Sequence, residues 1–94
     1  MNKTISWLKS CGYDVVDVHD NRIESRGTFV SINVVPHHLV DEADRLVSIL
    51  KNHKVDITIG LKIKNLIWID CAYFPESGTA HIYLYNINDE LLFG

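Results

Sequence analysis

The segment 37–54 constrains the fold of this chain more than any other. It reads HHLVDEADRLVSILKNHK, and its apolar residues recur at the spacing of a helix with one buried face. Acidic residues fill its first turns and basic residues its last turns, which is the order that suits the helix dipole. An amphipathic helix of this kind needs a sheet to pack against. Its predicted buried positions are Leu39, Val40, Ala43, Leu46, Val47 and Leu50.

The residues on both sides of this helix predict that sheet. Segment 55–64 alternates apolar and polar residues over its whole length, and 66–74 is apolar on nearly every position. In 28–35, Val30, Ile32 and Val34 alternate with more polar neighbours, so one face is expected to point inward. A short helix is expected at 4–10 and a short closing segment at 91–93. The remaining predicted strands are 13–19, 22–25 and 80–87.

The predicted element order is therefore α-β-β-β-α-β-β-β. We expect an α+β protein with a single antiparallel sheet of about five to six strands and two helices packed on one face. A chain of 94 residues suffices for one compact domain, residues 1–94, and leaves no room for a second core.

Composition excludes several classes of function. The chain is 47% hydrophobic and 22% charged, which is typical of a globular protein, and its net charge is −3. No global positive field draws it to nucleic acid or to an anionic membrane. The sequence has no secretory signal and no stretch long enough to span a bilayer, so we expect a cytoplasmic protein.

Two small constellations could carry chemistry. His37 and His38 precede Asp41 and Glu42, and i,i+4 ligands can share a metal on a helix. A third ligand is missing, and a solvated helix start with acids serving the dipole explains the same residues. We predict no metal site and no cofactor, although the sequence leaves open whether His37 and His38 bind a metal.

Cys71 and His81 form the second constellation. They lie on strands joined by the turn 75–78, so a hairpin could bring them together as a thiolate–imidazole pair. The register could equally place them on opposite faces, and no third orienting group is evident. A buried strand cysteine is the favoured interpretation, and we predict no catalytic residue.

An aromatic sheet face is the strongest candidate site. On the strand 80–87, His81, Tyr83, Tyr85 and Ile87 share one side, opposite the apolar pair Ile82 and Leu84. If that pair faces the helices, the tyrosines face away from them. Thr58, Lys62 and Lys64 of segment 55–64 would join them, with Ile67, Ile69, Cys71 or Tyr73 from the strand between.

Three interpretations of this face compete. Tyrosines are enriched in binding hot spots, so the face could be a protein interface, including a homodimer contact. Aromatic side chains on a sheet also stack nucleotides or single-stranded nucleic acid, but the acidic net charge disfavours that use. The tyrosines could instead simply cover the sheet, or segment 91–93 could fold back over them. A secondary acidic surface is expected at Asp41, Glu42 and Asp44.

The expected function is that of a small non-catalytic protein-binding domain, an inhibitor or adaptor of a larger protein whose identity the sequence does not specify. Its size suits a phage or mobile-element protein of the anti-defence type, because blocking a host enzyme needs only a surface. Nucleotide or single-stranded nucleic-acid binding through the aromatic and lysine face is the alternative. A small thiol enzyme using Cys71 is a weaker alternative. The predicted partner-binding residues are Lys62, Lys64, His81, Tyr83 and Tyr85.

Overall fold

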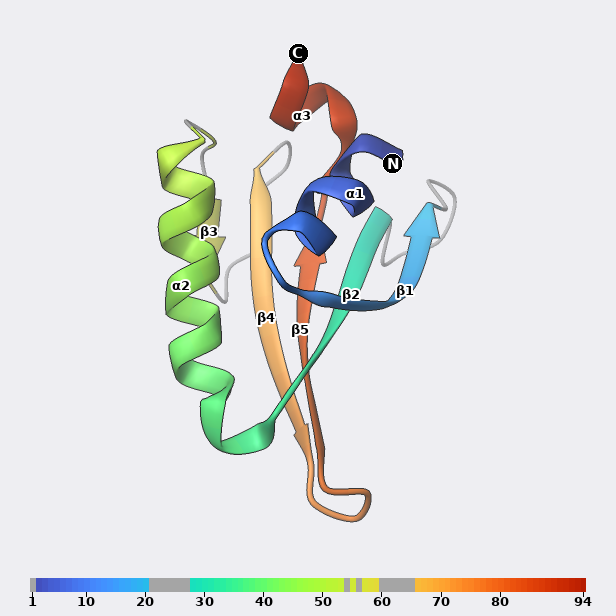
Figure 1. The fold of residues 1–94 in the computed structure, drawn as a ribbon, viewed down its shortest axis with the longest axis vertical. Helices are drawn as coiled ribbons and strands as arrows, with labels where there is room; N and C mark the ends of the chain where they lie inside the picture. Colours follow the sequence, from blue (N-terminus) through green and yellow to red (C-terminus); the bar gives the residue numbers. More distant parts are fainter. Residues whose placement is uncertain (1, 21–27, 54, 56, 60–65) are drawn as a thin grey trace.

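Three α-helices and five strands make up the described part of the fold (Figure 1). The computed structural model describes all residues except 1, 21–27, 54, 56 and 60–65. In chain order the elements are α1 (Asn2–Ser10), β1 (Asp14–Asp20), β2 (Thr28–Val34), the 3-10 turn η1 (Pro36–His38), α2 (Leu39–Asn52), β3 (Ile57–Ile59), β4 (Ile67–Phe74), β5 (Thr79–Tyr85) and α3 (Asp89–Phe93).

The sheet has the strand order β1-β2-β5-β4-β3. The pairs β1/β2, β2/β5 and β4/β5 are antiparallel, which confirms mixed helix and strand content around an antiparallel sheet. The edge strand β3 is parallel to β4, and this corrects the expectation of a wholly antiparallel sheet. Alternation shows which side chains share a face but not in which direction a strand runs.

One further detail of the predicted order is corrected, and two predicted strands lie partly or wholly outside the described residues. The strand predicted at 55–64 is present as β3 at Ile57–Ile59, and its residues 56 and 60–64 lie outside the described residues. The closing segment 91–93 is part of the helix α3, whose N-cap Asn88 accepts a hydrogen bond from the Leu91 N–H at 2.8 Å. The predicted strand 22–25 also lies outside the described residues.

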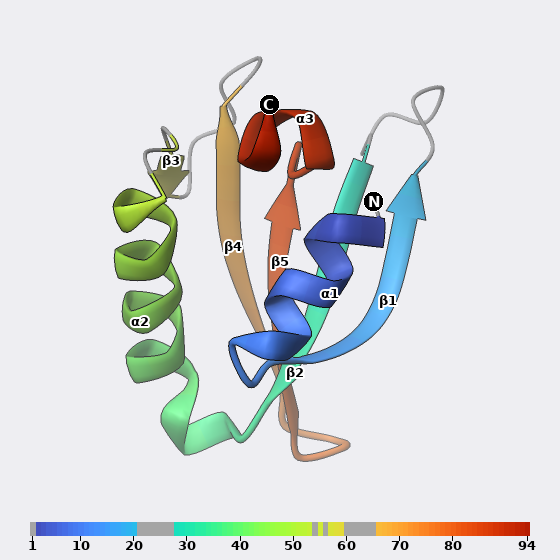
Figure 2. The same ribbon diagram turned by 45° about the horizontal axis from the view of Figure 1, so that its top comes forward.

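The helices α1 and α2 lie on the same face of the sheet, which we call the inner face (Figures 1 and 2). Leu8 of α1 and Leu46 and Leu50 of α2 are fully buried against it. Burying one such leucine stabilises the fold by about 1.5–3 kcal/mol. The strand residues in this core are Val30, Ile32, Val34, Ile67, Ile69, Ala80, Ile82 and Leu84.

The amphipathic helix confirms most of its predicted stripe. Ala43 and Val47 pack against the core beside Leu46 and Leu50. Val40, however, is 71% exposed, so its assignment to the buried face was wrong. It belongs to the first turn of α2, where the neighbouring Leu39 packs against the core instead.

Residues near the two ends of the chain are joined by hydrogen bonds that cap the helix α1. The Asp89 carboxylate accepts hydrogen bonds from the Thr4 hydroxyl and the Thr4 N–H, both at 2.7 Å, and from the Lys3 N–H at 3.3 Å. Asp89 therefore satisfies N–H groups that the first turn of α1 leaves unpaired. The hydrogen bond from the Thr4 side chain, followed by those from the backbone, holds the pKa of Asp89 well below its usual range.

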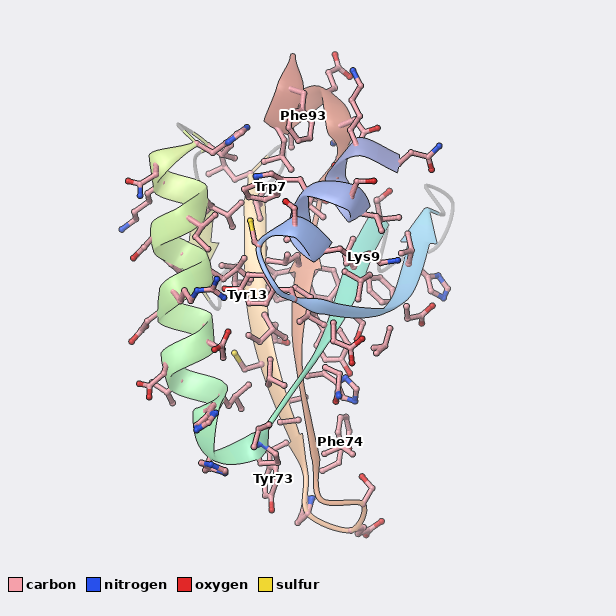
Figure 3. The ribbon with its side chains drawn as sticks, in the orientation of Figure 1. Trp7, Lys9, Tyr13, Tyr73, Phe74 and Phe93 are labelled. Atoms are coloured by element: carbon pink, nitrogen blue, oxygen red, sulfur yellow. The ribbon has the colours of Figure 1, made fainter. Side chains whose placement is uncertain are left out.

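Two other contacts hold the helices to one another. Trp7 of α1 lies 5.1 Å from His53 and 6.4 Å from Phe93 between ring centroids, and Figure 3 shows Trp7 and Phe93 near the same end of the molecule. The Arg45 guanidinium of α2 donates to the Cys11 carbonyl oxygen at 2.6 Å and lies 4.9 Å from the centre of the Tyr13 ring. Among the helices of the described segments, none combines the length and apolar character needed to cross a bilayer.

Candidate binding face on the uncovered side of the sheet

The strand registers identify the side chains that point away from the helices. In β2, Val30 and Ile32 belong to the core, so Phe29, Ser31 and Asn33 point to the opposite side, which we call the outer face. The views in Figures 1 and 2 show no helix on that side. The outer face comprises Asp14, Asp17, His19, Phe29, Ser31, Asn33, Trp68, Asp70, Ala72, Phe74, Thr79, His81, Tyr83 and Tyr85.

One row across the outer face carries an aromatic side chain on each of the four strands β1, β2, β5 and β4. His19 pairs with Phe29, Phe29 with Tyr85, and Tyr85 with Trp68. The His19 and Phe29 rings are stacked with centroids 4.7 Å apart, and those of Trp68 and Tyr85 are stacked at 4.4 Å. Phe29 and Tyr85 join the two stacks at 5.5 Å. Pairs of this kind stabilise a sheet by about 0.5–1.5 kcal/mol beyond their burial.

Further rings extend this row along the sheet. Tyr83 lies 6.2 Å from Phe29 and 6.4 Å from Tyr85 between centroids, and His81 lies 6.1 Å from Tyr83. Phe74 continues the series at 5.7 Å from His81, and Figure 3 places it toward the hairpin end of the molecule. We call the set the ring layer; its members are His19, Phe29, Trp68, Phe74, His81, Tyr83 and Tyr85.

The rings of this layer bury one another rather than being buried by a helix. Phe29 at its centre is only 6% exposed, whereas Phe74 at its end is 44% exposed and the others are partly buried. Two polar atoms are enclosed without a hydrogen-bond partner among the described residues, the Trp68 indole nitrogen and Nδ1 of His81. The layer is thus an apolar surface with polar atoms beneath it.

Carboxylates stand on both sides of the ring layer. In the row next to the aromatic one, Asp17 pairs with Ser31, Ser31 with Tyr83, and Tyr83 with Asp70. Asp17 accepts the Val18 N–H at 2.9 Å, and Asp70 accepts the Cys71 N–H at 2.9 Å. We call Asp17 and Asp70 the rim carboxylates. Both are exposed.

A β-bulge adds a third acid to this face. The register between β1 and β2 shifts between Val15 and Asp17, so Asp14 and Asp17 point to the same side although three positions separate them. Asp14 accepts a hydrogen bond from the Asn33 side chain at 3.4 Å. Alternation read from the sequence would place Asp14 and Asp17 on opposite faces.

The structure brings three of the predicted partner-binding residues together. His81, Tyr83 and Tyr85 form consecutive ring contacts on the outer face. Lys62 and Lys64 lie outside the described residues. Ile87 is buried in the core and not on this face, because β5 ends at Tyr85 and Asn86, with φ 65°, interrupts the alternation. The segment 91–93 does not cover the tyrosines, because Phe93 contacts Trp7 and His53 instead.

The sequence analysis assigned the wrong side of β4 to this face. Ile67 and Ile69 are in the core, and Cys71 and Tyr73 share their side of the strand. The outer face receives Trp68, Asp70, Ala72 and Phe74 instead. Segment 66–74 is apolar on both faces, so periodicity alone could not assign its sides. Sequence reasoning missed His19, Phe29, Trp68 and Phe74, and their shared feature is an aromatic ring on the side opposite Val30 and Ile69.

Cys71 and His81 are separated by the sheet. Cys71 pairs with Ile82, whereas His81 pairs with Ala72, so the two side chains point to opposite faces. Cys71 is exposed, which corrects the expectation of a buried strand cysteine. Partial desolvation, followed by the nearby charge of Asp70, raises the pKa of its thiol. A raised pKa lowers the thiolate fraction at neutral pH, which is the reverse of what a nucleophilic cysteine needs.

The remaining polar candidates are on the helix side. His37 and His38 are exposed at the 3-10 turn with ring centroids 4.1 Å apart, and no group of three potential metal ligands occurs in the described segments. Asp41 and Asp44 are exposed on α2, and Glu42 contacts Arg45 at 3.5 Å, an i,i+3 ion pair.

A small pocket of about 200 Å³ lies between the start of β1, the end of β2 and α2. Asp14 and Glu42 line it together with Arg45, so its charges select neither an anion nor a cation. Tyr13 lines it as well, and its buried hydroxyl has no hydrogen-bond partner among the described residues. Burial raises the pKa of Tyr13.

The described residues form a small α+β fold whose mainly antiparallel sheet carries the ring layer on its outer face. No protein-family model, curated protein or solved structure matches the chain.

Proposed function

We propose that this chain is a small non-catalytic protein-binding domain that inhibits or recruits a larger protein through the outer face of its sheet. The observation that carries this proposal is the ring layer, which spans four strands and continues from Phe29 to Phe74. Tyr and Trp are enriched in binding hot spots, and contiguous apolar patches of this kind mark interaction sites.

The chemistry of the outer face favours a protein over nucleic acid. Its described residues include two exposed rim carboxylates, Asp17 and Asp70, and neither Lys nor Arg. Phosphate groups would be repelled by these carboxylates, and single-strand binding draws much of its affinity from basic side chains. The separation of Cys71 from His81 likewise favours binding over thiol catalysis.

A different protein fits this face better than a second copy of the chain. In a face-to-face homodimer, each copy would contribute Asp17 and Asp70 to one interface. The described residues of the face offer no Lys or Arg to neutralise those four carboxylates. Burying unpaired charges is expensive.

The test is a pull-down from a lysate of the source organism, with and without nuclease, comparing matched tyrosine variants. We expect wild type to recover one protein in stoichiometric amount, with or without nuclease. Tyr83→Ala/Tyr85→Ala should lose it. The control is Tyr73→Ala, which removes a 55% exposed tyrosine from the opposite side of β4.

Circular dichroism would verify that each variant is folded. Retention of the partner by the folded double variant would refute the proposed face. Recovery that disappears with nuclease would move the function to nucleic-acid binding.

A further inference from the structure

The outer face carries a charge pattern that indicates the chemistry of its partner, and this step rests on the proposed function. Asp17 and Asp70 occupy the two ends of one cross-strand row, with Ser31 and Tyr83 between them. Neighbouring strands lie about 4.8 Å apart, so three strand spacings separate the two ends by about 14 Å.

Both rim carboxylates are held in place yet retain an unused oxygen. Oδ1 of Asp17 accepts the Val18 N–H, and Oδ1 of Asp70 accepts the Cys71 N–H. In the described part of the chain, the second oxygen of each accepts no hydrogen bond and forms no ion pair. The described basic residues are all on α1 and α2, on the other side of the sheet; they are Lys3, Lys9, Arg45 and Lys51.

Each rim carboxylate also has an aromatic neighbour on its own strand. Trp68 lies two residues before Asp70, and His19 lies two residues after Asp17, so each pair shares the outer face. A cationic side chain beside Asp70 would meet a carboxylate and the indole ring of Trp68 together, and Trp is the best ring for cation–π attraction. This combination suits arginine better than lysine, because guanidinium groups stack on aromatic faces.

We propose that the partner presents an extended segment with basic side chains at positions i and i+4 and an apolar side chain at i+2, lying across the strands along the Asp17–Asp70 row. Four residues of extended chain span about 13–14 Å and return the side chain to the same side. On a helix, side chains return close to the same side at i+3, i+4, i+7 and i+11, about 4.5, 6, 10.5 and 16.5 Å along the axis, and none of these spans equals 14 Å. The extended segment therefore matches the row and a helix does not.

The apolar side chain at i+2 of that segment would lie over Ser31, the smallest residue of the Asp17–Asp70 row. Ser31 is almost fully buried between larger neighbours, and Tyr83 stands beside it. An aliphatic side chain at i+2 would pack on the edges of Phe29 and Tyr83, whose ring centroids are 6.2 Å apart. The row would thus bind one apolar and two cationic side chains.

The test uses two synthetic peptides of identical composition on the full chain. In the first, two arginines stand at i and i+4 with a leucine midway and serine or threonine elsewhere; in the second, the arginines are adjacent. Binding is measured by NMR titration of amide shifts in wild type, Asp17→Asn, Asp70→Asn and the control Glu90→Gln, an exposed acid on α3. The asparagine variants remove charge but keep an oxygen that can accept the next N–H.

We expect the first peptide to bind more tightly and to shift amides of β1, β4 and β5. Each rim variant should lower its affinity about two- to fivefold, the range for one exposed ion pair, and Glu90→Gln should not. Equal affinity of the two peptides, no binding of either, or unchanged affinity in both rim variants would overturn the inference. If Tyr83→Ala/Tyr85→Ala still abolishes recovery of the partner in that case, the proposed function stands without it.

Discussion

The two faces of the sheet bury apolar side chains in different ways. The inner face is aliphatic, and residues such as Ile82 and Leu84 are fully buried only because α1 and α2 lie over them. On the outer face, Tyr83 and Tyr85 alternate with those residues on the same strand but are shielded by neighbouring rings. An aromatic ring buries a large area, so neighbouring rings can cover much of one another across the strands.

This difference separates stability from binding. Removing a side chain from the inner face leaves a cavity between the sheet and a helix, which adds to the lost burial. Removing a ring from the outer face opens a surface that water can fill. Substitutions on the inner face should therefore reduce the free energy of unfolding, whereas those on the outer face should mainly change affinity.

The strongest test of this comparison uses adjacent residues of β5. Leu84→Ala should lower the free energy of unfolding by about 2–5 kcal/mol, because Leu84 is fully buried. Tyr83→Ala, one residue earlier on the outer face, should lower it by less. Urea denaturation of the two variants measures the difference, and an equal loss would show that the outer face is part of the core.

The hydrogen bonds that Asp89 accepts at the start of α1 should make the stability of the protein depend on pH. Because Asp89 has a lowered pKa in the folded state, its contribution is complete above the ordinary carboxyl pKa of about 3.9 and is lost as pH falls through the lower folded value. Asp89→Asn should lower the thermal midpoint at neutral pH and lessen its fall in acid. Melting curves from neutral pH down to pH of about 2 test this. A parallel decline in wild type and variant would exclude Asp89 as the cause.

The ring layer should show pairwise coupling even though no helix covers it. In a double-mutant cycle with Trp68→Leu and Tyr85→Leu, we expect a coupling energy of about 0.5–1.5 kcal/mol, because the two rings are stacked at 4.4 Å. Chemical denaturation of the four proteins provides the values. Additive effects would mean that the rings lie side by side without stabilising each other.

The last prediction is a small gain in stability from a substitution at Tyr13. Tyr13→Phe removes a buried hydroxyl that has no hydrogen-bond partner in the described residues and keeps the ring beneath Arg45. We expect stability to rise by about 1 kcal/mol, within the range that an unsatisfied buried polar group costs. A loss measured by urea denaturation would show that the hydroxyl has a partner.

The sequence by itself determined the features that depend on local periodicity. The helix 39–52 followed from apolar spacing, and the opposite orientation of Ile82 and Tyr83 followed from alternation. Both patterns are set by neighbours a few residues apart. They also identified His81, Tyr83 and Tyr85 as one surface.

Only the tertiary structure decided which residues join that surface. Segment 66–74 is apolar on both faces, so its register with β5 had to place Trp68 beside Tyr85 and Ile69 in the core. The bulge at β1 turned Asp14 and Asp17 to one side, and the cap between Asp89 and Thr4 joins residues at opposite ends of the chain. Register, strand direction and long-range caps depend on hydrogen bonds between segments that are distant in sequence. A local pattern of residues does not specify which distant segment supplies those partners.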